Sequence, residues 1–169
     1  MFRPLNFLIL SIVLALNPAS AASEEVDLEL VLAMDASGSI SEQDYILQLE
    51  GTASAFLHEE IRAAIRSGPL GKIAVNIMLW SDAAFPKVST GWVVLDDDFS
   101  IIAFANTIRG FQLGKDGKVL IGGGGTGIGS GIKEALRLIE NNRYDGLRKT
   151  IDESGDGIVT EFEFSPRAE

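Results

Sequence analysis

The stretch L-E-L-V-L-A-M-D-A-S-G-S-I-S occupies residues 28–41 and joins a strand pattern to a helix start. Residues 28–34 are almost continuously apolar over the length of one strand, which is typical of a strand covered on both faces of a parallel sheet. Asp35, Ser37 and Ser39 then place a carboxylate and two hydroxyls at alternate positions. On a turn at the carboxyl end of a strand, such oxygens suit a hard divalent cation. The stretch therefore predicts an α/β protein with a metal-binding turn.

A helix is predicted directly after this turn. Ser41, with Asp44 three residues later, indicates an N-cap. Apolar residues then recur at spacings of three and four, which predicts one amphipathic helix; they are Ile46, Leu49, Ala53, Phe56, Leu57, Ile61, Ala64 and Ile65. Gly68 and Pro69 predict its end.

Two more strands and two more helices follow in the pattern. Residues 72–80 alternate side-chain types in a way that predicts a second strand, and residues 92–95 predict a short third one. Asp96, Asp97 and Asp98 begin a helical stretch, where their charges complement the positive end of the helix dipole rather than forming a metal site. A second helical stretch runs through Ile132, Ala135, Leu136 and Ile139.

The Asp35-x-Ser37-x-Ser39 turn, placed between a strand and a helix, resembles the metal-ion-dependent adhesion site of von Willebrand factor A domains. The resemblance covers about residues 26–157. With Trp80-Ser81-Asp82 after the second strand, the chain is most similar to the bacterial exported branch of that family, whose members mostly lack an assigned role. It implies a doubly wound, mostly parallel, Rossmann-like sheet with helices on both faces and residues 92–95 as an antiparallel edge strand.

The same resemblance implies two more metal ligands from distant loops. Thr126 and Asp156 stand at the matching positions. The complete set would hold Mg²⁺ or Mn²⁺ with one octahedral position open. Because the protein supplies only two carboxylates, the ion keeps positive character, and an Asp or Glu of a protein partner could complete its shell. The expected function is therefore a metal-dependent, non-enzymatic protein-interaction module of the adhesion type.

The beginning of the chain has the pattern of a secretory signal peptide over residues 1–22. Arg3 supplies the positive start, residues 7–16 an apolar run, and residues 19–21 a small-residue cleavage site. The run is too short to span a bilayer comfortably. We therefore expect a periplasmic or secreted protein with no membrane span after cleavage.

The resembling domain, residues 23–157, looks truncated, because such domains usually continue for further strands and helices. Residues 158–169 form the remaining tail. In the family order, the strand near Thr150 and Ile151 becomes an uncovered sheet edge. The alternating segment 159–164 is a candidate to cover that edge.

Residues 152–163 also match the ligand pattern of an EF-hand calcium loop, with Gly157 at its sixth position. The candidate Ca²⁺ ligands are Asp152, Ser154, Asp156, Ile158 through its carbonyl, Thr160 and Glu163. The flanks fit less well, because Gly146 interrupts the incoming helix and Pro166 the outgoing one. Calcium binding is thus the alternative function, and both hypotheses claim the carboxylate of Asp156.

Other function classes fit the sequence less well. The formal net charge of -10 argues against nucleic acid or an anionic membrane as partner. The single histidine, His58, falls within the first predicted helix beside two glutamates, and there is no cysteine, so no general base or nucleophile is evident. We therefore expect no enzymatic activity.

The glycines of residues 122–131 formally match a dinucleotide fingerprint as Gly122-x-Gly124-x-x-Gly127, with residues 119–121 as a possible preceding strand. A run of four consecutive glycines meets many patterns by chance. A loop that brings its backbone and the Thr126 hydroxyl close to an ion explains the same residues. NAD binding by a nucleotide-dependent enzyme remains the third hypothesis.

Overall fold

The computed structural model describes residues 23–111 and 124–156. The strands are β1 (Glu24–Asp35), β2 (Ile73–Trp80), β3 (Val88–Ser89), β4 (Val93–Leu95) and β5 (Tyr144–Ser154). The helices are α1 (Glu42–Leu57), α2 (Glu59–Arg66), α3 (Asp98–Gly110) and α4 (Ile128–Glu140). The predicted signal peptide, the possible strand at 119–121 and the tail at 158–169 lie outside the described residues.

The strands form one mixed sheet in the order β3-β2-β1-β5, with β4 also pairing with β2. The long ladders of β1 with β2 and of β1 with β5 are parallel. The short strands β3 and β4 run antiparallel to β2. β1 is thus the central strand of these two ladders, and its residues pack in core clusters on both faces of the sheet, which accounts for its near-continuous apolar sequence. The antiparallel pairing predicted for residues 92–95 is confirmed.

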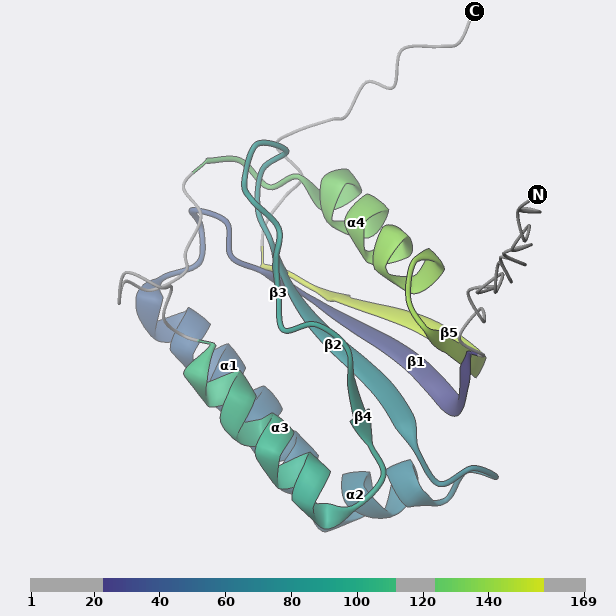
Figure 1. The fold of residues 1–169 in the computed structure, drawn as a ribbon. Coiled ribbons are helices and arrows are strands. Elements are labelled where there is room, and N and C mark those ends of the chain that lie inside the picture. Colours follow the sequence, from purple (N-terminus) through teal and green to yellow (C-terminus); the bar gives the residue numbers. More distant parts are fainter. Residues whose placement is uncertain (1–22, 112–123, 157–169) are drawn as a thin grey trace, which may run out of the picture.

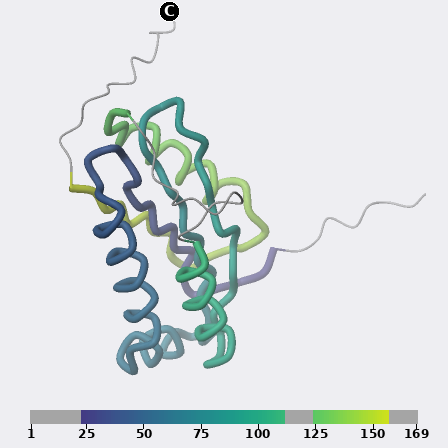
Figure 2. The backbone as a smooth tube through the Cα atoms, turned by 90° about the vertical axis from the view of Figure 1, so that its left-hand side faces the viewer, coloured from purple at the N-terminus to yellow at the C-terminus, as the bar shows by residue number. Residues whose placement is uncertain are grey.

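Helices cover both faces of this sheet. In Figure 1, α1 and α3 lie on one face and α4 on the other, and Figure 2 shows α1 and α3 side by side. The larger core cluster joins the sheet to α1 and α3, with Leu49, Phe56 and Phe104 among its buried members. A smaller cluster, centred on Trp80 and Ala135, joins the sheet to α4. The predicted fold class, a doubly wound and mostly parallel α/β sheet, is confirmed.

The prediction of one helix from Ser41 to Ile65 is wrong in its middle. The helix ends at Leu57, and His58 has an extended backbone (φ −67°, ψ 137°) before α2 begins at Glu59. Figure 1 shows α2 lying across the end of α1. This turn lets Ile65 reach the core while Arg62 and Arg66 reach α3, which a straight continuation of α1 would not allow. His58 therefore lies at a helix break, not within a helix.

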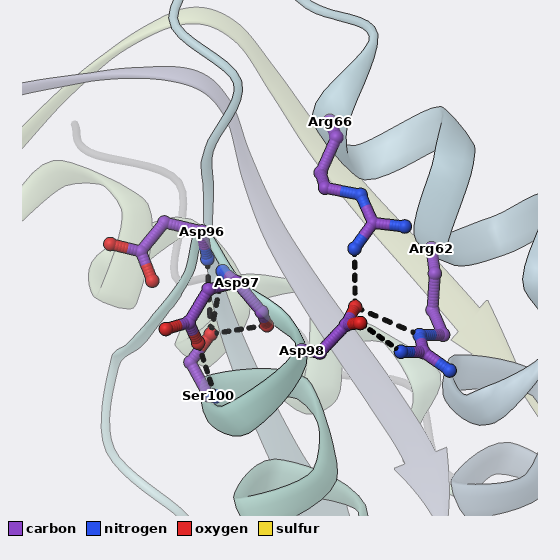
Figure 3. A network of polar contacts seen from close by, with 6 residues as sticks. All are labelled: Arg62, Arg66, Asp96, Asp97, Asp98 and Ser100. Carbon is purple, nitrogen blue, oxygen red and sulfur yellow. Dashed lines mark hydrogen bonds and ion pairs between the residues drawn. The ribbon is translucent and has the colours of Figure 1, made fainter.

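Of the three adjacent aspartates, Asp97 and Asp98 use their carboxylates at the start of α3, where the sequence predicts the acids to act. The Asp97 carboxylate accepts a hydrogen bond of 2.7 Å from the backbone amide of Ser100, which completes a capping box. Asp98 forms ion pairs with Arg62 and Arg66 (Figure 3). The hydrogen bond from the Arg62 side chain holds the pKa of Asp98 below its usual value, and Arg66 contributes further. Asp97 therefore caps α3, and Asp98 joins α2 to α3.

Within the described residues β5 is an edge strand, which confirms the expectation for Thr150 and Ile151. It is much longer than those two residues, and β3 was not predicted at all.

An apolar groove of about 590 Å³ lies between α1, α2 and the sheet, and Asp152 and Ser154 of β5 contribute to its lining. No helix in residues 23–111 and 124–156 is long and apolar enough to cross a membrane.

Candidate metal centre

The first predicted site loop follows β1 at the carboxyl end of the sheet. Asp35 is the last residue of β1, and its Oδ1 accepts a hydrogen bond of 2.7 Å from the backbone amide of Ser37. The Ala36 amide donates to the carbonyl of Trp80 at 2.8 Å, which ties the loop to β2. Asp35 and Ser37 are both fully buried. The sheet therefore fixes the start of this loop.

Hydrogen bonds connect this loop to two others that are distant in sequence. The hydroxyls of Ser37 and Ser39 lie 3.0 Å apart, and the Ser39 hydroxyl donates to Oδ1 of Asp156 at 3.0 Å. The Thr126 hydroxyl lies 3.5 Å from that of Ser37, at the limit of a hydrogen bond. The structure thus brings all five predicted residues together, and we call Asp35, Ser37, Ser39, Thr126 and Asp156 the loop cluster.

Glycines allow the second loop to approach the sheet. The Gly127 amide donates to the carbonyl of Ser81 at 3.2 Å, and a Cβ at Gly127 would lie only 3.0 Å from that oxygen. Gly124 has a φ of +118°, and a Cβ there would lie 2.1 Å from Oδ2 of Asp82. These two glycines are therefore needed where the loop meets the end of β2. This packing accounts for part of the glycine pattern without a nucleotide; Gly122 lies outside the described residues.

The third loop leaves β5 beside Asp35. A Cβ at Gly155 would lie 3.0 Å from Oδ2 of Asp35 and 3.3 Å from Cζ2 of Trp80. Gly155 thus allows the chain to carry Asp156 over the end of β1 to Ser39. Asp156 and Ser39 are exposed, whereas the other three members of the loop cluster are buried. The loop cluster therefore opens to solvent on the side of Ser39 and Asp156.

The interior of the site has polar atoms without partners. Oδ2 of Asp35, Oε1 of Glu153, Nε1 of Trp80 and Oγ of Ser81 are buried and form no hydrogen bond within the described part of the chain. Burial raises the pKa of the Glu153 carboxyl to about 7, and the negative charge of Asp35 adds to this rise. Sequence reasoning missed Glu153 as a site residue. The available signal was its period-two spacing from Ile151, which places an acid on an inward face of the strand.

The candidate calcium ligands are placed differently. Asp152 and Ser154 belong to strand β5, and Ser154 accepts a hydrogen bond of 2.8 Å from the Gln48 side chain. The segment before them is a strand and not the incoming helix of an EF-hand. Ile158, Thr160 and Glu163 lie outside the described residues. Among the described members of this set, Asp156 is the one that reaches the loop cluster.

The fold and the site together define an α/β protein whose polar loops gather at the carboxyl end of a parallel sheet. The chain belongs to the family described as "Protein of unknown function (DUF1194)", which matches residues 25–167. This range includes all the described helices and strands except Glu24, the first residue of β1. No curated protein matches the chain.

Proposed function

We propose that the loop cluster binds a divalent cation, Mg²⁺ or Mn²⁺, and that the chain is an exported, non-enzymatic protein-interaction module. The observation that carries this proposal is the convergence of three distant loops on a fully buried Asp35 whose Oδ2 has no protein partner. An ionised carboxylate in such a place is costly unless a positive charge compensates it. A cation at this end of the sheet would supply that charge.

The chemistry of the donor set supports a hard cation. The loop cluster offers two carboxylates and three hydroxyls, and Mg²⁺ and Mn²⁺ prefer oxygen ligands in octahedral geometry. Ser37, Ser39 and Asp156 are already joined by hydrogen bonds, so little rearrangement is needed to gather their oxygens. The resemblance of this turn to the adhesion site of von Willebrand factor A domains supports the same assignment.

The exposure of the site supports a role in recognition. Ser39 and Asp156 face solvent, so an ion beside them is accessible from outside the protein. A partner carboxylate, from an Asp or Glu side chain, would complete the ion's coordination there. Binding of the partner would then require the metal. The signal-peptide pattern of residues 1–22 supports an exported location for such a module.

The position of the single histidine also argues against acid-base catalysis at this site. His58 follows the last residue of α1, whereas the loop cluster lies before the first turn of that helix. A helix of 16 residues is about 24 Å long, so His58 is remote from the loop cluster. The described residues offer no other histidine for that role.

Metal titration of the full chain tests the proposal. Thermal unfolding is measured in EDTA and with Mg²⁺, Mn²⁺, Ca²⁺ or NAD, for the wild type, Asp35→Ala, Glu163→Ala and the control Asp96→Ala. Mg²⁺ or Mn²⁺ at about 100 times Kd should stabilise the wild type by about 2.7 kcal/mol, which corresponds to roughly 8 °C. Asp35→Ala should abolish this shift, and Asp96→Ala, which removes the same charge at α3, should keep it.

Three results would contradict the proposal. Unchanged melting of the wild type in EDTA and in metal would show that no ion binds. A Ca²⁺-selective shift that is lost in Glu163→Ala but kept in Asp35→Ala would favour the calcium loop instead. Stabilisation by NAD with no response to metal would favour the nucleotide hypothesis.

A further inference from the structure

Strand β1 carries two buried carboxylates on one face, and their surroundings differ. Glu29 and Asp35 are both 0% exposed. Glu29 pairs in register with Lys149 of β5, whose Nζ lies 2.8 Å from Glu29 Oε1. The Asn142 side chain and the Gly146 amide each donate to Glu29 at 2.7 Å. At this end of the strand, the protein therefore supplies both a cation and hydrogen-bond donors.

The loop end of the same face has the opposite arrangement. Glu153 of β5 pairs in register with Ala33, two positions before Asp35. Side chains alternate along a strand, so Glu153 and Asp35 lie on one face. Oδ2 of Asp35 and Oε1 of Glu153 have no hydrogen-bond partner, and neither residue takes part in an ion pair among the described residues. At the loop end of the sheet, β5 thus places the acid Glu153 near Asp35, whereas at the other end it places Lys149 beside Glu29.

Gly131 and Gly155 each lie close both to the indole ring of Trp80 and to one of these carboxylates. A Cβ at Gly131 of α4 would lie 2.9 Å from Cγ of Trp80 and 3.2 Å from Oε1 of Glu153. A Cβ at Gly155 would lie 3.0 Å from Oδ2 of Asp35 and 3.3 Å from Cζ2 of the same ring. Like charges beside an apolar ring, away from water, repel one another strongly.

We propose that Glu153 is a further residue of the cation site, whose carboxylate acts with that of Asp35 to attract the divalent ion and to set its affinity. This inference rests on the proposed function. No group of three acidic, histidine or cysteine side chains that could hold a metal ion occurs in residues 23–111 and 124–156, so Glu153 is not a third acidic ligand beside Asp35 and Asp156. Its carboxylate would act on the ion through its charge, and the side of the site at Ser39 and Asp156 stays open to the partner's carboxylate.

The proposal predicts an unusual pair of effects for Glu153→Gln. Removing one of two repelling carboxylates should raise the melting temperature in EDTA, while Mn²⁺ binding should weaken by about 10-fold or more. Mn²⁺ affinity is measured by calorimetry on the full chain. Asp152→Asn is the matched control, because it removes the same charge one residue away, on the opposite face of β5. Glu153→Met removes the charge without introducing an amide and serves as a second variant.

The outcomes separate this inference from the proposed function. Mn²⁺ affinity unchanged in Glu153→Gln and Glu153→Met, together with a large loss in Asp35→Asn, would overturn the role of Glu153 and leave the metal site standing. Equal losses in Glu153→Gln and Asp152→Asn would also overturn it, because the cause would then be overall charge. A wild type that binds no Mn²⁺ would overturn both proposals.

Discussion

The Ser39 hydroxyl donates a hydrogen bond of 3.0 Å to Oδ1 of Asp156, a residue 117 positions later in the chain. This contact joins the loop after β1 to the loop after β5. Parallel neighbours such as β1 and β5 end at the same edge of a sheet, so their following loops meet there. The parallel pairing of β1 with β5 therefore brings Asp156 to Ser39, so that one proposed metal site contains residues from both loops.

Two serines near this contact should have opposite roles. Ser39→Ala removes the hydroxyl that contacts Asp156 and Ser37, so we expect Mn²⁺ affinity to fall about 10-fold or more with little change in stability. Ser41→Ala removes the N-cap of α1, which should cost about 1 kcal/mol of stability and leave metal affinity unchanged. Calorimetry and urea unfolding of both variants test this pair. Equal metal affinities in the two variants would contradict the assignment of Ser39.

Two glycines of α4 should respond differently to alanine. Nothing lies within 4 Å of a Cβ at Gly129, so Gly129→Ala should stabilise the protein by about 0.5 to 1 kcal/mol through helix propensity. A Cβ at Gly131 would lie 2.9 Å from Cγ of Trp80, so Gly131→Ala should destabilise by about 1 to 3 kcal/mol. Urea unfolding measures both values. Stabilisation by Gly131→Ala would show that α4 does not pack against Trp80 as described.

The buried Glu29 should depend on its lysine. Lys149→Met leaves Glu29 with Asn142 and the Gly146 amide but without a cation, so we expect a loss of about 1 to 3 kcal/mol. This is less than for a fully buried pair, because the Lys149 side chain is 44% exposed. Arg148→Met, on the opposite face of β5, is the control and should change stability by less than about 0.5 kcal/mol. Similar losses in both variants would indicate a general effect of charge on β5.

The metal-free protein should lose stability as pH rises towards neutrality. The pKa of Glu153 is about 7 in the folded protein and has the ordinary value of 4.5 as its reference. Between these two pKa values the folded state binds more protons than the unfolded state, so the free energy of unfolding falls as pH rises. The stabilisation that protonated Glu153 provides is complete below about pH 4.5 and lost above about pH 7. Melting temperatures in EDTA across this range should show the decline in the wild type and a smaller one in Glu153→Gln. Parallel pH profiles for the two proteins would show that Glu153 is not shifted.

Local sequence patterns were sufficient for most of the elements and for the loop after β1. The apolar run of residues 28–34, the cap at Ser41 and the acids before α3 depend on neighbours within a few positions, and the structure contains each of them. Only the resemblance to the adhesion site of von Willebrand factor A domains indicates Thr126 and Asp156. In the structure, Thr126 lies beside Ser37 and Asp156 beside Ser39.

Other features required the tertiary structure. The break at His58 has no glycine or proline to mark it, and it follows from the contacts that α2 makes with α3 and the core. The calcium-loop pattern indicates Asp152 and Ser154 as ligands. Glu153, between them, instead lies on the same face of the sheet as Asp35. Which acid of β5 lies inward depends on how that strand pairs with β1.

The sequence by itself determined most of the strands and helices, because backbone preference, capping and side-chain periodicity act over a few residues. Only the tertiary structure decided that β5 pairs with β1 in the register that gives Glu29 a lysine and leaves Glu153 beside Asp35. A shift of one residue would turn each of these side chains to the other face of the sheet. Such long-range register arises from the packing of the whole chain, and no short stretch of residues specifies it.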